Sequence, residues 1–282
     1  MPKSRTEPGA GAVQQVGARG LDRRRRLVAW IDSLRGWRRA LLLMALGAMA
    51  TAAMPPLYFW PLLFLALPGL VLMLDGTPSV RRAFWTGWWF GLGHFTTGFY
   101  WIANAMLTDP WRFGWMIPIF VGGLGVFMAV FIGIAAGLSR FLWTPGPARV
   151  LALGAAWIVG EWLRSWVLSG FPWNLLGYSW GFSDSMMQLA AWTGSWGLSL
   201  MTVVACGLAA LLLRWSPESA QVQPLLGKAG FMAAAGVALI GIAWAAGAAR
   251  LGDATDALVP GVTLRLVQPA IPPGVKNDPG RR

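Results

Sequence analysis

The sequence predicts an all-α transmembrane bundle of about seven helices, followed by one β-strand that opens a further domain. Three observations lead to this prediction. Of the 282 residues, 56% are hydrophobic and only 12% are charged, about half the charged share of soluble domains. The mean hydropathy is +0.55. The chain also has 19 Trp against 3 Tyr, and indole rings favour the membrane–water interface.

Seven apolar segments follow one another along the chain. Residues 40–74 carry no charge, and this stretch is too long for one crossing at about 20 residues. Pro55-Pro56 is expected to divide it into a hairpin of two short helices. The expected helices are 40–54, 57–74, 83–106, 114–138, 149–168, 186–213 and 229–249.

The N-terminal segment 1–39 is basic, with ten of the 23 Lys and Arg residues. We expect disorder up to about Leu27, then a short amphipathic stretch, Leu27–Trp37, on the membrane surface. Because the positive charge is concentrated before the first apolar segment, we interpret it as an anchor to anionic lipid headgroups. The net charge of +12 therefore does not predict binding to nucleic acid.

The loops predict which side of the membrane each segment faces. If the N-terminus is cytoplasmic, the inside segments 1–39, 75–82, 139–149 and 214–228 hold 10, 2, 2 and 2 basic residues. The short outside loops 107–113 and 169–185 hold only Arg112. This distribution follows the positive-inside rule. It predicts a multi-pass protein of the bacterial inner membrane, with a cytoplasmic N-terminus and a periplasmic C-terminus.

A cleavable leader is the competing interpretation of the first apolar segment. Arg38-Arg39, the run Leu41–Leu46 and the small residues Ala50-Thr51-Ala52 resemble a signal peptide with its cleavage site. Six further apolar segments follow and need no cleaved leader, so an uncleaved anchor is favoured.

A charged pair lies near the outer end of the fifth expected helix. Glu161 and Arg164 are three residues apart, so they share a helical face and can pair. A charge in a membrane helix usually faces the bundle interior or water. The pair is expected either to orient the helix as a structural ion pair or to contact a lipid headgroup or substrate at the outer interface.

The loop after this helix is aromatic. Gly170 and Pro172 are expected to end the helix, and three rings, Phe171, Trp173 and Tyr178, then follow at headgroup level. They form either an interfacial belt or, together with Glu161 and Arg164, a site for an acyl chain or lipid headgroup. Glycines of the third and sixth expected helices are expected to serve close helix packing; these are Gly87, Gly91, Gly98, Gly194 and Gly197.

Other chemically active residues are few. His94 is the only histidine and is expected to be a hydrogen-bonded core residue, because no second ligand for a metal lies near it. Cys206, the only cysteine, is expected to be a buried apolar residue of a membrane helix. No cofactor motif is present. Near the C-terminus, Val262–Val267 alternates and is β-branched, which predicts a strand.

Several of these stretches, in this order and spacing, resemble the apolipoprotein N-acyltransferase family. The matching pieces are Gly98–Ile102, Trp157–Trp173, Gly177-Tyr178, Thr193–Ser199 and Leu264–Pro272. The resemblance implies a nitrilase-like αββα domain on a transmembrane bundle. It implies an activity that takes an acyl chain from a phospholipid as a cysteine thioester and passes it to the N-terminal amine of diacylglyceryl-cysteine lipoproteins. The expected partners are this phospholipid donor, those apolipoproteins and membrane lipids.

The resemblance also implies a catalytic Glu, Lys and Cys in the nitrilase-like domain, and none of these has a counterpart here. The lysines are Lys3, Lys228 and Lys276 only. We therefore expect no catalytic residue in this chain and no activity of the chain alone. The expected division is a basic N-terminus (1–39), a helical bundle (40–249) and the start of a truncated periplasmic domain (250–282). A membrane transporter and a non-catalytic lipid-binding subunit are the alternative functions.

Overall fold

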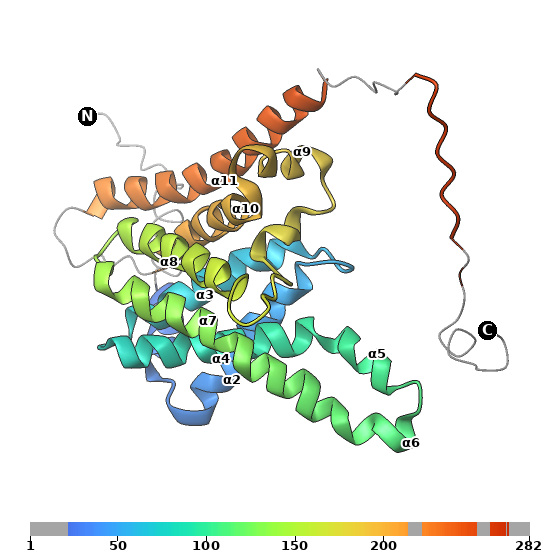
Figure 1. Ribbon diagram of the computed structural model, residues 1–282. Helices are drawn as coiled ribbons and strands as arrows, with labels where there is room; N and C mark the ends of the chain where they lie inside the picture. Colours follow the sequence, from blue (N-terminus) through green and yellow to red (C-terminus); the bar gives the residue numbers. More distant parts are fainter. Residues whose placement is uncertain (1–21, 214–221, 253–259, 269, 271–282) are drawn as a thin grey trace, which may run out of the picture. The chain divides into compact units, whose positions relative to one another are not determined.

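The computed structural model describes residues 22–213, 222–252, 260–268 and 270. Two compact units, Met1–Gly252 and Asp253–Arg282, are considered separately. The helices of the described residues all lie in the first unit (Figure 1). The all-α prediction is confirmed for this unit, since no strand occurs among the described residues.

The chain becomes helical earlier than expected. Residues 22–33 form a helix, so the prediction of disorder up to about Leu27 is wrong for residues 22–27, and its earlier part lies outside the described residues. Residues 34 and 35 interrupt the expected surface helix Leu27–Trp37, and α2 (Gly36–Ala52) begins directly after them. The break coincides with Gly36, whose φ of +53° is a conformation that favours glycine.

The uncharged stretch 40–74 folds as the expected hairpin. α2 ends before Pro55-Pro56, and α3 (Leu63–Asp75) begins after a 3₁₀ turn, Trp60–Leu62. Nine of the 13 residues of α3 are buried. Because α3 is apolar all round and shorter than a membrane crossing, it has the character of a core helix of the bundle.

α4 (Val80–Gly98) contacts both α2 and α7 (Gly123–Ser139) along its length. Glycines make this approach possible. A Cβ on Gly87 would overlap the backbone of Ile132 on α7, and a Cβ on Gly91 would overlap the backbone of Ala129. The packing role expected of these two glycines is confirmed.

The fourth expected helix, 114–138, is longer in the structure. Helical backbone runs from Pro110 to Leu142 through α6 (Pro110–Phe113), a 3₁₀ turn, a π-helical turn and α7. The π-helical turn, Pro118–Gly122, begins at a proline, which has no N–H to donate to the preceding turn. α5 (Ala103–Met106) and α6 form the tip of the α4–α7 hairpin (Figure 1).

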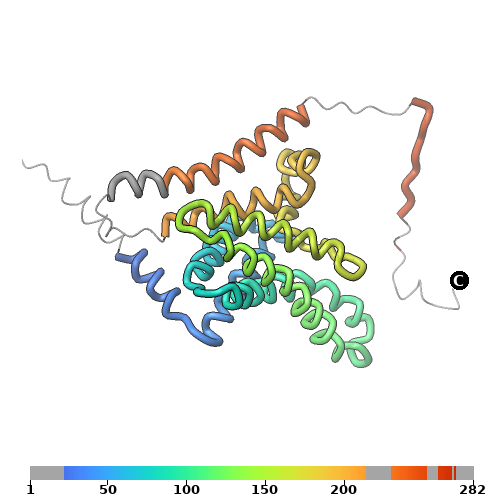
Figure 2. Tube along the Cα trace, turned by 60° about the vertical axis from the view of Figure 1, so that its left-hand side comes forward, coloured from blue at the N-terminus to red at the C-terminus, as the bar shows by residue number. Residues whose placement is uncertain are grey.

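The second half of this unit consists of α8 (Ala148–Arg164), the short α9 (Asp184–Met187), α10 (Ala190–Gly207) and α11 (Val222–Gly252). α7, α8, α10 and α11 pack side by side in that order (Figures 1 and 2). α10 is kinked at Gly194, where φ is +66° and a Cβ would meet nothing within 4 Å. The packing role expected of Gly194 is therefore wrong: this glycine supplies a backbone conformation.

Three helical stretches of the described residues are long and apolar enough to cross a membrane. They are Pro110–Leu142, Ala190–Leu212 and Gly230–Gly252. The expected count of seven crossings is not confirmed. α2 and α8 have 17 residues each, close to the lower limit for a crossing, and α8 carries buried Arg149, Glu161 and Arg164.

Contacts between helix ends occur at both ends of α8. At the start of α8, Arg149 Nε lies 3.4 Å from Asp75 Oδ1 at the end of α3. Near the start of α2, Arg39 donates to the carbonyl of Met73 at 2.7 Å. At the far end of α8, Phe171 packs on Phe99, with ring centroids 5.4 Å apart. The starts of α2 and α8, which carry these arginines, thus lie at the end of α3, at the opposite end of α8 from the aromatic loop.

In the second unit the structure describes residues 260–268 and 270. The expected strand Val262–Val267 has no regular secondary structure, so this prediction is not confirmed. A single strand has no neighbour to pair its backbone groups, and no such neighbour occurs among the described residues.

Candidate functional site

The candidate site is built on the last turns of α8 and the loop that follows. α8 ends at Arg164, four residues before the expected end. Gly170 has a φ of +78°, and the N–H of Phe171 then donates to the carbonyl of Arg164 at 2.9 Å. This turn folds the loop back over the end of its own helix, because a glycine adopts the left-handed conformation at little cost.

Glu161 and Arg164 are both buried, with 5% and 2% of their surfaces exposed. Both lie on the face of α8 that contains Trp157 and Gly160, as their spacing predicted. The two charges act on each other electrostatically, but their side chains do not form a close ion pair such as the one between Arg149 and Asp75. Each charged side chain binds the backbone of the following loop instead.

Glu161 uses one carboxylate oxygen for two bonds. Its Oε1 accepts from the indole N–H of Trp157 at 3.0 Å and from the backbone N–H of Leu176 at 2.8 Å. The other oxygen, Oε2, is buried and has no hydrogen-bond partner in the described part of the chain. The carboxylate therefore fixes the far end of the loop, where the 3₁₀ helix Leu176–Trp180 begins.

Arg164 fixes the middle of the loop. Its Nη1 donates to the carbonyl of Phe171 at 3.2 Å and to the carbonyl of Trp173. The guanidinium also lies over the ring of Phe95 on α4, 4.9 Å from the centroid, a favourable cation–π contact. We call Glu161, Arg164 and the backbone that they hold, 171–176, the loop clamp.

The three aromatic residues of the expected site differ in their surroundings. Phe171 is half-buried and packs on Phe99. Trp173 is 52% exposed and lies beside Trp101, with ring centroids 5.3 Å apart. Tyr178 donates its hydroxyl to the carbonyl of Pro172 at 3.3 Å. Burial, together with the nearby Glu161 carboxylate, raises the pKa of Tyr178, so its hydroxyl stays protonated at neutral pH.

His94 connects α2, α4 and the loop. It is 1% exposed. Its Nδ1 lies 3.0 Å from Thr51 Oγ1, and its Nε2 lies 3.3 Å from the carbonyl of Asn174. The prediction of a hydrogen-bonded core histidine is confirmed.

Sequence reasoning missed Asn174, Thr51 and Phe95. Asn174 offered one local signal, because asparagine tolerates the left-handed backbone that it adopts here, with φ of +54°. Thr51 and Phe95 gave no signal, since their partners lie far along the chain.

The loop clamp and the neighbouring His94 enclose little space. His94, Glu161, Arg164 and Asn174 line a cavity of about 10 Å³, which is about the room that one water molecule needs. The clamp therefore cannot admit an acyl chain or a headgroup in this conformation. The accessible part of the site is the aromatic surface formed by Trp101 and Trp173, which the clamp supports.

The remaining reactive side chains lie elsewhere. Cys206 is fully buried in α10, in agreement with the expectation of a buried apolar residue. Among the described residues, no three His, Cys, Asp or Glu side chains gather in a way that could hold a metal ion.

Comparison with known proteins identifies the family. A family model described as the apolipoprotein N-acyltransferase N-terminal domain matches residues 46–208, a range that contains the clamp. An apolipoprotein N-acyltransferase of Allorhizobium ampelinum is 39% identical over 267 residues, which cover 90% of this chain and 47% of the relative. That of Rhodopseudomonas palustris is 34% identical over 259 residues, which cover 87% and 45%. That of Brucella suis is 40% identical over 196 residues, which cover 66% and 37%.

The chain thus spans about half the length, or less, of the curated relatives that it matches. The family model alone covers more than half of this chain. The chain belongs to the apolipoprotein N-acyltransferase family, and its residues 46–208 correspond to the N-terminal domain of that family.

Proposed function

We propose that this chain supplies the membrane-embedded part of an apolipoprotein N-acyltransferase of the bacterial inner membrane. In that reaction an ester bond of a phospholipid breaks and a lysophospholipid leaves. The acyl chain passes through a cysteine thioester to the N-terminal amine of a diacylglyceryl-cysteine lipoprotein, where an amide forms. The observation that carries this proposal is the family match over residues 46–208.

The proposed topology has seven crossings, with the N-terminus inside and residue 282 outside. Two facts support it. The inside segments hold 16 of the basic residues counted above, and the short outside loops hold one. In addition, Arg39 and Arg149 contact the last residues of α3 at one end of the bundle, so segments assigned to the same side of the membrane lie together.

Within this function we assign the clamp a positioning role. Glu161 and Arg164 are buried and hold the loop, whereas Trp173 is exposed beside Trp101. Exposed indoles at headgroup level suit the glycerol region of a phospholipid, because they have an apolar face and a polar N–H. The proposed lipid site is therefore the aromatic surface at Trp173. Phe171, which packs on Phe99, and Tyr178, which binds the carbonyl of Pro172, support this surface.

The chain alone is proposed to be inactive. An acyl-enzyme needs a nucleophile beside a base and an oxyanion donor, within about 3 Å. The only thiol, Cys206, is buried in α10. No Lys, Asp or Glu occurs between Ser185 and Arg214.

A hybrid protein tests the proposal. Residues 1–268 are joined to the remainder of the Allorhizobium ampelinum relative and expressed in cells whose own N-acyltransferase is repressed. Growth with triacylated lipoprotein, measured by mass spectrometry, is the expected result. The catalytic half without this chain is the control and should not restore growth. A stable, membrane-inserted hybrid that leaves lipoproteins diacylated would contradict the proposal.

A further inference from the structure

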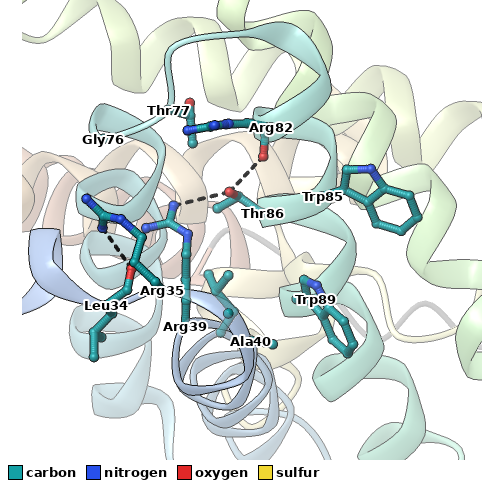
Figure 3. Close-up of a pocket in the computed structure, with 12 residues that line it drawn as sticks. Leu34, Arg35, Arg39, Ala40, Gly76, Thr77, Arg82, Trp85, Thr86 and Trp89 are labelled. Carbon is teal, nitrogen blue, oxygen red and sulfur yellow. Dashed lines mark hydrogen bonds between the residues drawn. The ribbon is translucent and has the colours of Figure 1, made fainter.

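A second polar site lies at the opposite end of the bundle from the clamp. The start of α2, the turn after α3 and the start of α4 enclose an open cavity of about 380 Å³ (Figure 3). Three arginines line it, Arg35, Arg39 and Arg82, together with Trp85 and Trp89 of α4. Its volume falls within the range of small-ligand sites, about 300–1,000 Å³.

Arg39 is held in place at the back of the cavity. Its Nη2 donates to the carbonyl of Met73 at 2.7 Å and to Thr86 Oγ1 at 3.3 Å. Thr86 is itself fixed, because its hydroxyl donates to the carbonyl of Arg82 at 2.9 Å (Figure 3). Both contacts of Arg39 use one nitrogen, so the N–H groups on Nη1 and Nε remain for a ligand.

Arg35 and Arg82 stand at the mouth of the cavity and are exposed. Arg35 Nη1 donates to the carbonyl of Asp32 and to that of Leu34, the latter at 2.9 Å, so its Nη2 and Nε remain for a ligand. The guanidinium of Arg82 has no hydrogen-bond or ion-pair partner within the described residues (Figure 3). Three guanidinium groups thus converge on one space from two helices and the residue before α2.

None of the described residues that line this cavity carries a carboxylate. Asp75, one residue before the lining begins on the α3 side, contacts Arg149 Nε at 3.4 Å and Trp143 Nε1 at 3.0 Å. Asp32 acts electrostatically on Arg39, as do Arg35 and Arg82. Even with Asp32 counted, the charges around the cavity sum to a positive value.

The two tryptophans of the cavity wall indicate that the ligand also has an apolar part. Trp85 is 46% exposed and Trp89 is half-buried. They are four residues apart on α4, so they present neighbouring indoles along one wall. A ligand that fits both features has a phosphate for the arginines and an apolar part beside the indoles. Basic pockets between helix ends of membrane proteins suit anionic headgroups in this way.

We propose that this cavity binds the phosphate of an anionic phospholipid such as phosphatidylglycerol, at the level where α2 and α4 begin. Arg35, Arg39 and Arg82 donate to the phosphate oxygens, as arginine forks do at phosphate sites. Trp85 and Trp89 flank the glycerol and the first part of an acyl chain. The site is separate from the clamp, and it rests on the proposed function only for its placement in a membrane.

Native mass spectrometry of the purified, delipidated chain tests the site. The chain is offered equal amounts of phosphatidylglycerol and phosphatidylcholine with the same acyl chains. The wild type should retain phosphatidylglycerol in preference, because three guanidinium groups disfavour a choline cation. The double variant R35Q/R82Q should bind at least about tenfold less phosphatidylglycerol, since it loses charge-assisted contacts. Arg39 is left unchanged because it also holds Met73.

The matched control is R38Q/R81Q. Arg38 and Arg81 are exposed neighbours that do not line the cavity, and the change in net charge is the same. Equal losses in the two double variants, or equal retention of the two lipids by the wild type, would overturn the proposal. Displacement of the lipid by millimolar inorganic phosphate would assign the cavity to a free anion and would also overturn it. Because the readout is lipid binding, these outcomes do not depend on acyl transfer.

Discussion

The carboxylate of Glu161 accepts a hydrogen bond from the backbone N–H of Leu176 at 2.8 Å, across 15 positions of the chain. Arg164, one turn further along α8, donates to the carbonyls of Phe171 and Trp173 within the same loop. Two buried charges thus serve one purpose, which is to close a loop against the end of its helix. The exposed ring of Trp173 is held in place as a result.

Changing Glu161 to alanine should destabilise the chain. The N–H groups of Trp157 and Leu176 would both lose their acceptor, and a buried unsatisfied polar group costs about 1–3 kcal/mol. We expect thermal unfolding in detergent at a clearly lower temperature for Glu161→Ala. Glu161→Gln keeps an oxygen acceptor and should lie close to the wild type. If the two variants unfold together, the hydrogen bonds of Glu161 do not hold the loop.

Replacing Arg164 by lysine should loosen the loop while keeping the charge. Arg164 reaches both carbonyls with Nη1 while its planar guanidinium lies over the ring of Phe95. An ammonium on a shorter side chain cannot keep that stacked position and reach both carbonyls. Hydrogen exchange of residues 165–175 should become at least about tenfold faster, which corresponds to a loss of roughly 1.4 kcal/mol of local stability. Exchange in the first turns of α8 should not change. The control is Arg112→Lys, at an exposed position of α6, and it should leave residues 165–175 as they are.

Trp173 and Phe171 should have different effects in the hybrid enzyme. Trp173→Ala removes an exposed ring and should raise the KM for phospholipid about three- to tenfold with little change in stability, as expected for one aromatic contact. Phe171→Ala removes a ring packed on Phe99 and should lower stability by about 1–3 kcal/mol.

Trp111 offers the matched control for Trp173, because it is 98% exposed and lies on α6. Steady-state kinetics with phospholipid and a diacylglyceryl-cysteine peptide measures the effect. Equal KM values for Trp173→Ala and Trp111→Ala would mean that Trp173 only anchors the protein at the membrane interface and does not bind the substrate.

The chain alone should produce no triacylated peptide when given phospholipid and a diacylglyceryl-cysteine peptide. In the hybrid, Cys206→Ser should leave the activity within about twofold, because a conservative change of a buried residue outside the site has little effect on catalysis. Mass spectrometry of the peptide checks both statements. An acylated product that depends on Cys206 would refute the argument that this thiol is only a packing residue.

Reporter fusions check the proposed topology. Alkaline phosphatase fused after Arg282 should be active, because the enzyme works only outside the cytoplasm. The same reporter placed in the segment 214–221 should be inactive, and a cytoplasmic reporter should show the reverse pattern. An inactive phosphatase after Arg282 would mean that the number of crossings is not odd.

Local sequence features determined several parts of this fold. The division of 40–74 into two helices follows from Pro55-Pro56, since a proline in a helix interior removes a hydrogen bond and clashes with the preceding turn. The shared face of Glu161 and Arg164 follows from their spacing of three residues. The core position of His94 followed from the absence of a partner for metal binding. These inferences needed only neighbours within a few positions of the chain.

Tertiary structure decided what these residues contact. Charge and spacing left two roles open for Glu161 and Arg164, a structural ion pair or a contact to a headgroup or substrate. In the structure both bind backbone groups 7 to 15 positions away. The burial of α3 likewise depends on the helices around it. Val262–Val267 has strand composition but no strand neighbour among the described residues. The physical reason is common to all of these: hydrogen-bond partners and packing surfaces are set by segments that lie far apart in sequence, and composition and spacing cannot specify which of them meet.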